Sequence, residues 1–462
     1  MKFFGALVLI VLVALGGAWI YAGRQPGPVI DISRPAKWVG ATTAVQVGVA
    51  APTLKSVSIV FEQNGKQTTL YTIAPATGST TGQGEVKQDA PGRETITTTI
   101  SRQTVPDLKT GPGRIVVTAS SPVVRGIRTA QTTATKDVQV RLEKPTIAVL
   151  STKHYVNLGG SEMVVYRSTP ADVESGVQVG DLTYPGYPAS GVHVDGVPAI
   201  TDPTIKVAFF ALLYDQDVNT PMFAYAKDEA GNSARADFDH LTFPKPFKKS
   251  RIDLPDSFLN RVVPAILATT DEVHPEGDVL QQFLVLNGDL RRKNADKIAS
   301  FSKQSSPEML WNGVVFHSFT NNAVEAAFAD QRTYIYHGKE VDQQVHLGFD
   351  LARVVHSPIV AANRGKVLYA APLGIYGNCI IIDHGMGVQS LYGHLSSFAV
   401  KAGDQVEKEQ QIGISGETGL AGGDHLHFTM LVGGRMVNPV EWWDAHWIQD
   451  RIVRKLRETT GS

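Results

Sequence analysis

Histidine and aspartate recur at even spacings in the last third of this 462-residue chain. His346 and Asp350 are four residues apart in the run VHLGFDLA, and His425 and His427 are two apart in HLHF. Side chains separated by an even number of residues point to the same face of an extended strand. Imidazole nitrogens and carboxylate oxygens are good zinc ligands. One such pair alone is usually structural, but two pairs on facing strands would form a metal site.

A catalytic zinc site usually has three protein ligands and one open position. If the two polar faces meet, one histidine of the HLHF pair would complete the ligand set and the other would stand beside the ion. His394 follows Gly393 in LYGHLSS, where the glycine permits a tight turn after a strand. Two histidines that do not ligate would suit proton transfer beside a metal. No HExxH motif is present, so a glutamate base of that type is not indicated.

The segments around these residues have the pattern of antiparallel strands. Between residues 308 and 445, apolar runs such as NCIIIDHG and GVQSLYGHL alternate with glycine-rich turns. The single cysteine, Cys379, lies in one of these runs, so the sequence allows no intramolecular disulfide and no cysteine metal cluster. We therefore predict that residues 308–445 form an antiparallel β-sheet domain that carries the site.

The chain before this domain divides into modules of different character. Residues 29–140 and 145–243 alternate polar and apolar residues between turns, which predicts two immunoglobulin-like β-sandwich modules. Residues 244–306 have apolar residues at helical spacing and predict a helical connector, whose arginines and lysines we expect to form a solvated face. Residues 446–462 predict an amphipathic C-terminal helix. The predicted fold class is mainly β.

The N-terminal region, residues 1–24, predicts a membrane anchor or a signal. Residues 3–22 are apolar throughout and long enough to form a transmembrane helix. A cleaved signal peptide is the alternative, because the small residues at 16–18 could form a cleavage site. In either case we expect the rest of the chain to be exported, held by the membrane anchor or soluble after cleavage. The net charge of −1 gives no reason to expect nucleic acid as a partner.

The chain from about residue 310 to 445 resembles the LytM/lysostaphin-type zinc metallopeptidases, which cut peptide bonds in bacterial peptidoglycan. The resemblance rests on VHLGFDLA, on the run from NCIIIDHG to LYGHLSS, on GGDHLHF and on VNPVEWW. Matched by motif, the family's zinc ligands fall on His346, Asp350 and His427. Its two catalytic histidines that do not bind zinc fall on His394 and His425. The resemblance therefore implies Zn²⁺ as cofactor and peptidoglycan as partner.

The resemblance implies an endopeptidase that hydrolyses peptide bonds in peptidoglycan stem peptides or cross-links. All five family positions are filled, which favours an enzyme over a non-catalytic cell-wall-binding or activator protein built on the same domain. A zinc protease that acts on proteins is a second alternative. The β modules would hold the domain away from the membrane or bind a regulatory protein. Exported modules with an anchor fit a periplasm, which favours cross-links that contain meso-diaminopimelate.

Overall fold

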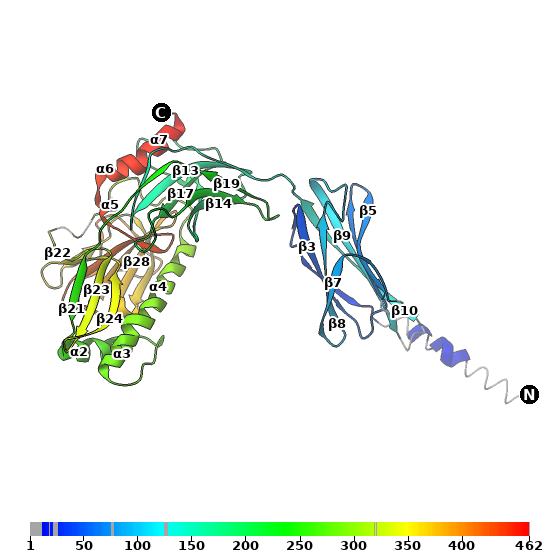
Figure 1. The fold of residues 1–462 in the computed structure, drawn as a ribbon, viewed down its shortest axis with the longest axis horizontal. Helices are drawn as coiled ribbons and strands as arrows, with labels where there is room; N and C mark the ends of the chain where they lie inside the picture. The colour runs from blue at the N-terminus through cyan, green and yellow to red at the C-terminus, as the bar shows by residue number, and fades with distance from the viewer. Residues whose placement is uncertain are drawn as a thin grey trace, which may run out of the picture. The chain divides into compact units, whose positions relative to one another are not determined.

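A computed structural model describes most of the chain, and strands dominate it (Figure 1). The mainly β fold class predicted from the sequence is confirmed. The chain divides into two compact units, residues 1–144 with 227–233, and residues 145–226 with 234–462. The described residues are 12–17, 19–21, 26–74, 78–123, 128–317, 319 and 321–461.

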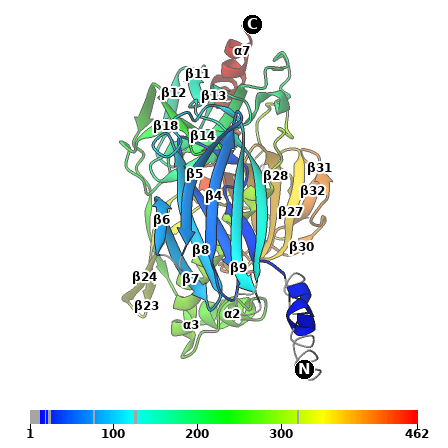
Figure 2. The ribbon, with the colours of Figure 1, turned by 90° about the vertical axis from the view of Figure 1, so that its right-hand side faces the viewer.

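The first unit contains two β-sheets that share one core. Their strand orders are β1-β3-β8-β7 and β2-β10-β9-β4-β5-β6, and β5, β4 and β9 lie side by side (Figure 2). Alternate residues of β4, among them Val57, Ile59 and Phe61, are buried in that core, as expected for a strand with one face covered. The strands are β1 (Val29–Arg34), β2 (Trp38–Val39), β3 (Thr42–Ala50), β4 (Ser56–Gln63), β5 (Lys66–Ala74), β6 (Ser79–Gly82), β7 (Gly84–Ala90), β8 (Arg93–Ser101), β9 (Gly111–Val123) and β10 (Arg128–Val140).

The predicted transmembrane segment, residues 3–22, lies in part outside the described residues. Among the helices that the structure describes, none has the length and the apolar character needed to cross a bilayer. The anchor therefore stays a prediction from the sequence, as does the immunoglobulin-like character of the two β modules.

The second unit begins with a β module of three sheets, with orders β11-β13-β17-β16, β15-β14-β18-β19 and β12-β20. All seven residues of β17, IKVAFFA, are buried, as expected for a strand covered on both faces. The elements are β11 (Thr146–Val149), β12 (His154–Asn157), β13 (Ser161–Thr169), β14 (Glu174–Val179), β15 (Leu182–Pro185), β16 (Tyr187–Pro188), the 3₁₀ turn η2 (Ala189–Gly191), β17 (Ile205–Ala211), β18 (Met222–Lys227), β19 (Ser233–Asp237) and β20 (His240–Phe243).

A connector of helices follows, and it starts with a strand. β21 (Lys249–Asp253) pairs in parallel with β23, an arrangement that the short and charged run KSRID does not reveal. An Asp278–Gln281 capping box starts the helical run that continues without a break into α4. The helices are α2 (Asp256–Leu267), α3 (Val279–Val285), the π-helical turn η3 (Leu286–Leu290), α4 (Arg291–Ser300) and the 3₁₀ turn η4 (Phe301–Gln304).

The last part of the chain forms the sheets that carry the candidate site. An eight-stranded sheet has the order β22-β25-β33-β29-β28-β27-β31, with β34 paired to β33; smaller sheets have the orders β21-β23-β24 and β26-β32-β30. The elements are β22 (Ala323–Ala326), β23 (Asp330–Tyr336), β24 (Lys339–His346), β25 (Phe349–Ala352), β26 (Pro358–Val360), β27 (Gly365–Pro372), η5 (Gly374–Tyr376), β28 (Asn378–Gly385), β29 (Val388–Leu395), β30 (Ser397–Phe398), β31 (Gln405–Val406), β32 (Gln411–Ile414), β33 (Leu426–Val432) and β34 (Arg435–Val437).

The C-terminal helices attach to the β module of the same unit. They are α5 (Val440–Trp443), α6 (Ala445–Ile448), the π-helical turn η6 (Gln449–Val453) and α7 (Arg454–Thr460). Lys455 on α7 and Glu162 on β13 are both fully buried, and 2.7 Å separates Nζ from Oε1. Lys455 also donates to the carbonyl of Met163 at 2.8 Å. A buried ion pair with further hydrogen bonds fixes the two elements to each other, because either charge alone would be costly to bury.

We expect Lys455→Met to lower the free energy of unfolding of the second unit by about 3–5 kcal/mol, because Glu162 would remain buried with only the more distant Arg451, at 3.9 Å, as a cation. Adding Glu162→Gln should recover part of the loss. The measurement is urea denaturation followed by tryptophan fluorescence. Arg454→Met is the matched control: Arg454 is 33% exposed and its surface ion pairs should contribute less than about 1 kcal/mol. Similar losses in both single variants would contradict the assignment.

Candidate active site

Three side chains from neighbouring strands meet at one point. His346 ends β24, Asp350 lies on β25, and His427 lies on β33 directly opposite Asp350 in the antiparallel register. His346 Nε2 lies 2.8 Å from Asp350 Oδ1 and 3.0 Å from His427 Nδ1. His427 Nδ1 lies 3.0 Å from the same carboxylate oxygen. All three residues are buried, and they form a group that could hold a metal ion.

The donor atoms of this group suit a cation. His346 Nδ1 lies 3.2 Å from the carbonyl oxygen of Ala327, which can only accept, so that nitrogen carries the proton and Nε2 presents a lone pair. A second imidazole nitrogen and a carboxylate oxygen converge on that lone pair. A cation among them would be held by two nitrogens and one oxygen, the ligand types of zinc.

Gly348 makes room for the His427 ring. A Cβ atom at this position would lie 2.5 Å from both Cε1 and Nε2 of His427 and 2.9 Å from the carbonyl oxygen of Phe428. Distances this short are not tolerated, so the ring could not keep its place beside any larger residue. The position therefore requires glycine because the His427 ring lies so close to it, and not because the chain makes a turn there.

His394 and His425 lie next to the three-residue group. His394 has a φ of +63°, a backbone conformation that is uncommon outside glycine and recurs at functional sites. Its Nδ1 donates to the carbonyl of Thr418 at 2.7 Å, and Nδ1 of His425 donates to the carbonyl of Gly423 at 2.9 Å. The two rings lie 4.8 Å apart between centroids. His394 therefore has Nε2 left for proton exchange, whereas Nε2 of His425 lies 3.5 Å from Asp350 Oδ1.

Burial and charge separate the proton affinities of these groups. Burial holds the pKa of His394 well below the ordinary value for histidine, and the neighbouring histidines add to this. Burial also acts to lower the pKa of His425, but the Asp350 carboxylate outweighs it and raises that pKa. Burial alone would raise the pKa of Asp350, yet His346 and the other histidines bring it well below its usual range. Two adjacent histidines thus differ in proton affinity, which suits a donor–acceptor pair.

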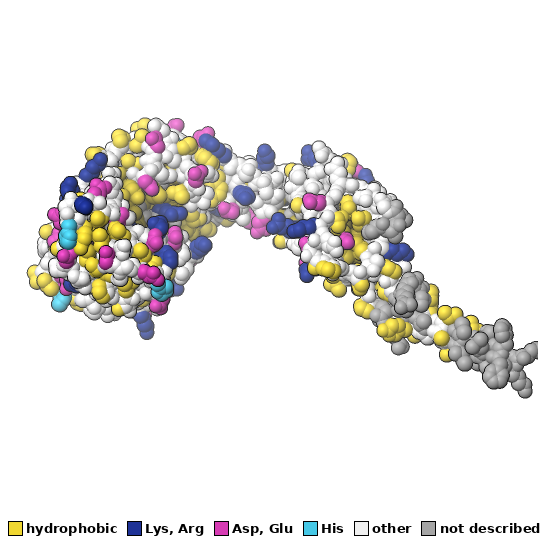
Figure 3. Space-filling model, turned by 60° about the horizontal axis from the view of Figure 1, so that its bottom comes forward, with side chains coloured by type: hydrophobic (Ala, Val, Ile, Leu, Met, Phe, Trp, Pro, Cys, Tyr) yellow, Lys and Arg dark blue, Asp and Glu magenta, His cyan; other side chains and the backbone are white. Residues whose placement is uncertain are grey.

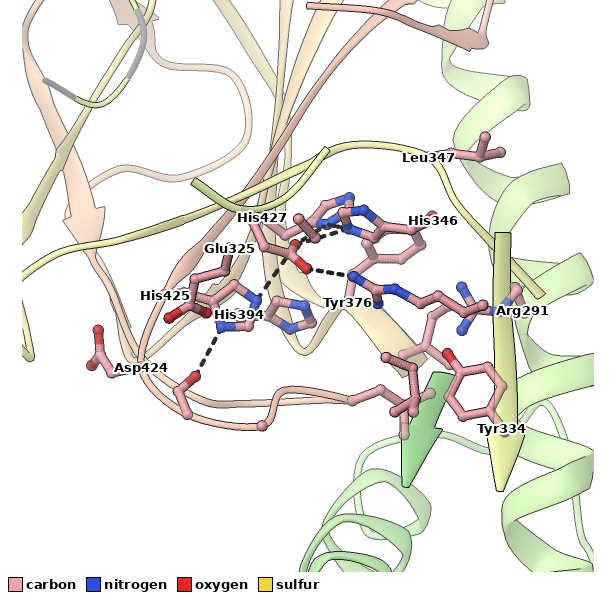
Figure 4. Close-up of a pocket in the computed structure, with 18 residues that line it drawn as sticks. Arg291, Glu325, Tyr334, His346, Leu347, Tyr376, His394, Asp424, His425 and His427 are labelled. Carbon is pink, nitrogen blue, oxygen red and sulfur yellow. Dashed lines mark hydrogen bonds and ion pairs between the residues drawn. The ribbon is translucent and has the colours of Figure 1, made fainter. Parts of the chain in front are cut away.

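A cavity of about 470 Å³ contains all five predicted site residues (Figure 4). Arg332 on β23 also lines it, and its Nη2 donates to Asp350 Oδ2 at 2.9 Å, so this guanidinium holds the second carboxylate oxygen. Arg291 at the start of α4 lines the cavity as well. The expectation that the basic residues of the connector only form a solvated face is therefore wrong at this position. Neither arginine was predicted from the sequence. Arg291 lies outside the family-like stretches, and Arg332 begins the stretch RTYIYHGKEVDQQVHLGFDLA but has no spacing to another polar residue that would single it out.

The C-terminal part of the chain matches a known family. Residues 344–439 match the model of peptidase family M23. The chain is 38% identical over 97 residues to DD-carboxypeptidase/endopeptidase Mpg of Neisseria meningitidis, over 21% of this chain and 22% of that protein. It is 38% identical over 96 residues to peptidoglycan DD-endopeptidase ShyA of Vibrio cholerae, again over 21% and 22%. The chain thus carries a peptidase family M23 domain, and the resemblance seen in the sequence is confirmed.

Similar solved structures include the catalytic domain of lysostaphin from Staphylococcus simulans. It is 28% identical, with a TM-score of 0.23, and the match covers 26% of this chain and 90% of that one. The matches to the two curated relatives span only 22% of their length. What the whole protein does is therefore a matter for proposal.

We expect Gly348→Ala to weaken zinc binding by about 10- to 100-fold, the usual range when groups that orient a ligand are disturbed. The added methyl group would displace the His427 ring. Competition with a chromophoric chelator measures the affinity. Gly422→Ala is the matched control, since no atom lies within 4 Å of the added Cβ in the same cavity. Equal zinc affinity in Gly348→Ala and the wild type would exclude His427 as a ligand.

Proposed function

We propose that this chain is a zinc-dependent endopeptidase that hydrolyses peptide bonds in peptidoglycan. The observation that carries the proposal is the convergence of His346, Asp350 and His427 within hydrogen-bond distance, with two further histidines in the same cavity. A match to the M23 family over residues 344–439 supports hydrolysis of peptide bonds.

We infer that His346 Nε2, Asp350 Oδ1 and His427 Nδ1 would hold Zn²⁺. A zinc ion bound there would supply Lewis acidity for the scissile carbonyl and for the attacking water. The protein keeps these ligands oriented: the Ala327 carbonyl holds His346, and Arg332 holds the outer oxygen of Asp350. Such outer contacts fix the ligand geometry before substrate arrives.

His394 and His425 would move the protons of the reaction. Their Nδ1 atoms are engaged by backbone carbonyls, so proton exchange falls to Nε2 in both residues. One histidine would take the proton of the attacking water, and one would deliver a proton to the leaving amine. In its protonated form either ring could also stabilise the oxyanion of the tetrahedral intermediate.

The names of the relatives support peptidoglycan as the substrate. ShyA is named a peptidoglycan DD-endopeptidase, and Mpg a DD-carboxypeptidase/endopeptidase. We propose that this chain cuts peptide cross-links, with those containing meso-diaminopimelate as the first candidates. No observation favours the alternatives of a non-catalytic wall-binding or activator protein or of a protease for protein substrates.

Peptidoglycan lies outside the cytoplasmic membrane, so we propose that the chain acts in the periplasm or facing the cell wall. The apolar segment 3–22 would anchor it or direct its export. The β modules would then space the domain from the membrane or bind a regulatory partner. On the face shown in Figure 3, acidic and basic side chains are interspersed, which gives no basis for steering a polyanion such as nucleic acid.

We expect purified full-length protein loaded with zinc to release uncross-linked muropeptides from isolated sacculi, as identified by mass spectrometry. His346→Ala should lose bound zinc and activity together. His394→Ala and His425→Ala should keep zinc but lower the rate by about 10²- to 10⁴-fold, because each removes a proton-transfer group.

The matched control is His446→Ala, a histidine that is 97% exposed and does not line the cavity. Unchanged cleavage by both His394→Ala and His425→Ala, with zinc bound, would refute their catalytic assignment. Cleavage of a panel of proteins but not of sacculi would favour a protein protease. Tight binding to sacculi without release of any product would favour the wall-binding alternative.

A further inference from the structure

Arg291 brings a positive charge into the cavity without a negative partner. It lies at the first position of α4 and is partly buried, and it lines the same cavity as the three-residue group. Its hydrogen bonds go to a single residue, Asn287: Nε donates to the carbonyl at 3.0 Å and Nη2 to Oδ1 at 2.5 Å. Within the described part of the chain, no carboxylate lies at ion-pair distance from it. A guanidinium is well suited to bind a carboxylate or a phosphate group of a ligand.

Asn287 fixes the position of the Arg291 guanidinium. Asn287 is fully buried, and its Nδ2 donates to Asp342 Oδ2 on β24 at 2.8 Å. That bond fixes the amide so that Oδ1 faces Arg291. Asn287 lies in the π-helical turn η3, a distortion that often occurs at functional sites. The backbone carbonyl of Asn287 thus accepts from Nε and its side-chain amide from Nη2, which leaves Nη1 to bind a ligand.

The charges in the cavity are separated into two ends (Figure 4). Asp424, Glu325 and His425 lie at one end, and Arg291 lies at the other, with the His346 and His427 rings between them. The second arginine, Arg332, already holds Asp350 and is engaged in that contact. Arg291 is thus the cavity-lining cation that no carboxylate of the described chain neutralises.

We propose that Arg291 binds a carboxylate of the peptide substrate and thereby selects peptides that carry a free carboxylate close to the scissile bond. This inference rests on the proposed peptidase function and adds to it the substrate class. Nη1 offers charged N–H donors to a carboxylate, and a partly desolvated pair of this kind is stronger than one in water. A peptide in which that group is an amide would leave the guanidinium unpaired and lose the interaction.

The test uses synthetic cross-linked peptides in which each carboxylate in turn is replaced by a carboxamide. For the zinc-loaded full chain we expect one amidation to lower kcat/KM at least about tenfold, mainly through KM, since the contact serves binding. In Arg291→Gln the acid and amide forms should be cleaved with a ratio near one. Arg291→Lys should keep part of the preference, because it keeps the charge. Arg292→Gln is the matched control: its side chain is 73% exposed, pairs with Asp289, and does not line the cavity.

If the wild-type protein cleaved every amidated peptide as fast as the corresponding acid peptide, the carboxylate site would be refuted and the peptidase function would stand. Absence of cleavage of any peptide would count against the peptidase function. Isothermal titration of the same peptides then decides the inference separately. Tighter binding of the acid form by the wild type but not by Arg291→Gln would support the site, and equal binding of acid and amide forms would reject it.

Discussion

The antiparallel pairing of β25 with β33 is the constraint on which the site depends. It sets Asp350 directly opposite His427, and β29 lies on the other side of β33 with Gly393 opposite His427. A shift of one residue in this register would turn the polar side chains into the apolar layer on the opposite face. The apolar residues of β33, such as Leu426 and Phe428, oppose such a shift because they are buried in the core. Packing of the sheet therefore keeps the geometry of the candidate site.

The peptidase domain and the preceding β module share one core, and the family-like stretch VNPVEWW joins them. Glu441 in this stretch is buried, and its carboxylate accepts from Asn157 Nδ2 at 2.8 Å and from the Ser161 amide at 2.7 Å. Burial nevertheless raises its pKa to about 7. The neighbouring Trp442 is completely buried and donates to Ser161 Oγ. Polar and apolar contacts together make this junction part of the core, so the module is packed against the domain and is not joined to it by a linker alone.

The sequence predicted the parts of the site that depend on local spacing. The even intervals between His346 and Asp350 and between His425 and His427 pointed to residues that the structure brings together with His394 in one cavity. The expectation that His346 and Asp350 share one extended strand is wrong, because His346 ends β24 and Asp350 lies on the next strand, β25. Contacts between segments that are far apart in the sequence could not be predicted from residue spacing. The strand β21 has no apolar run, and nothing in the sequence distinguishes Arg291 from other basic residues on a helix. Its place in the cavity depends on how the helical connector packs beside the sheet.

The residues predicted from the sequence and the residues found only in the structure lie in different parts of the chain. The five candidate zinc-binding and proton-transfer residues all fall within residues 344–439, the part that matches the M23 model. Arg291, Glu325 and Arg332 line the same cavity but lie before that range. In such an arrangement one part of the chain supplies the reacting groups and other segments line the cavity around them. Changes in those other segments can alter substrate binding without altering the chemistry. For the proposed peptidase, we therefore expect the cavity-lining residues before residue 344 to influence which substrate binds.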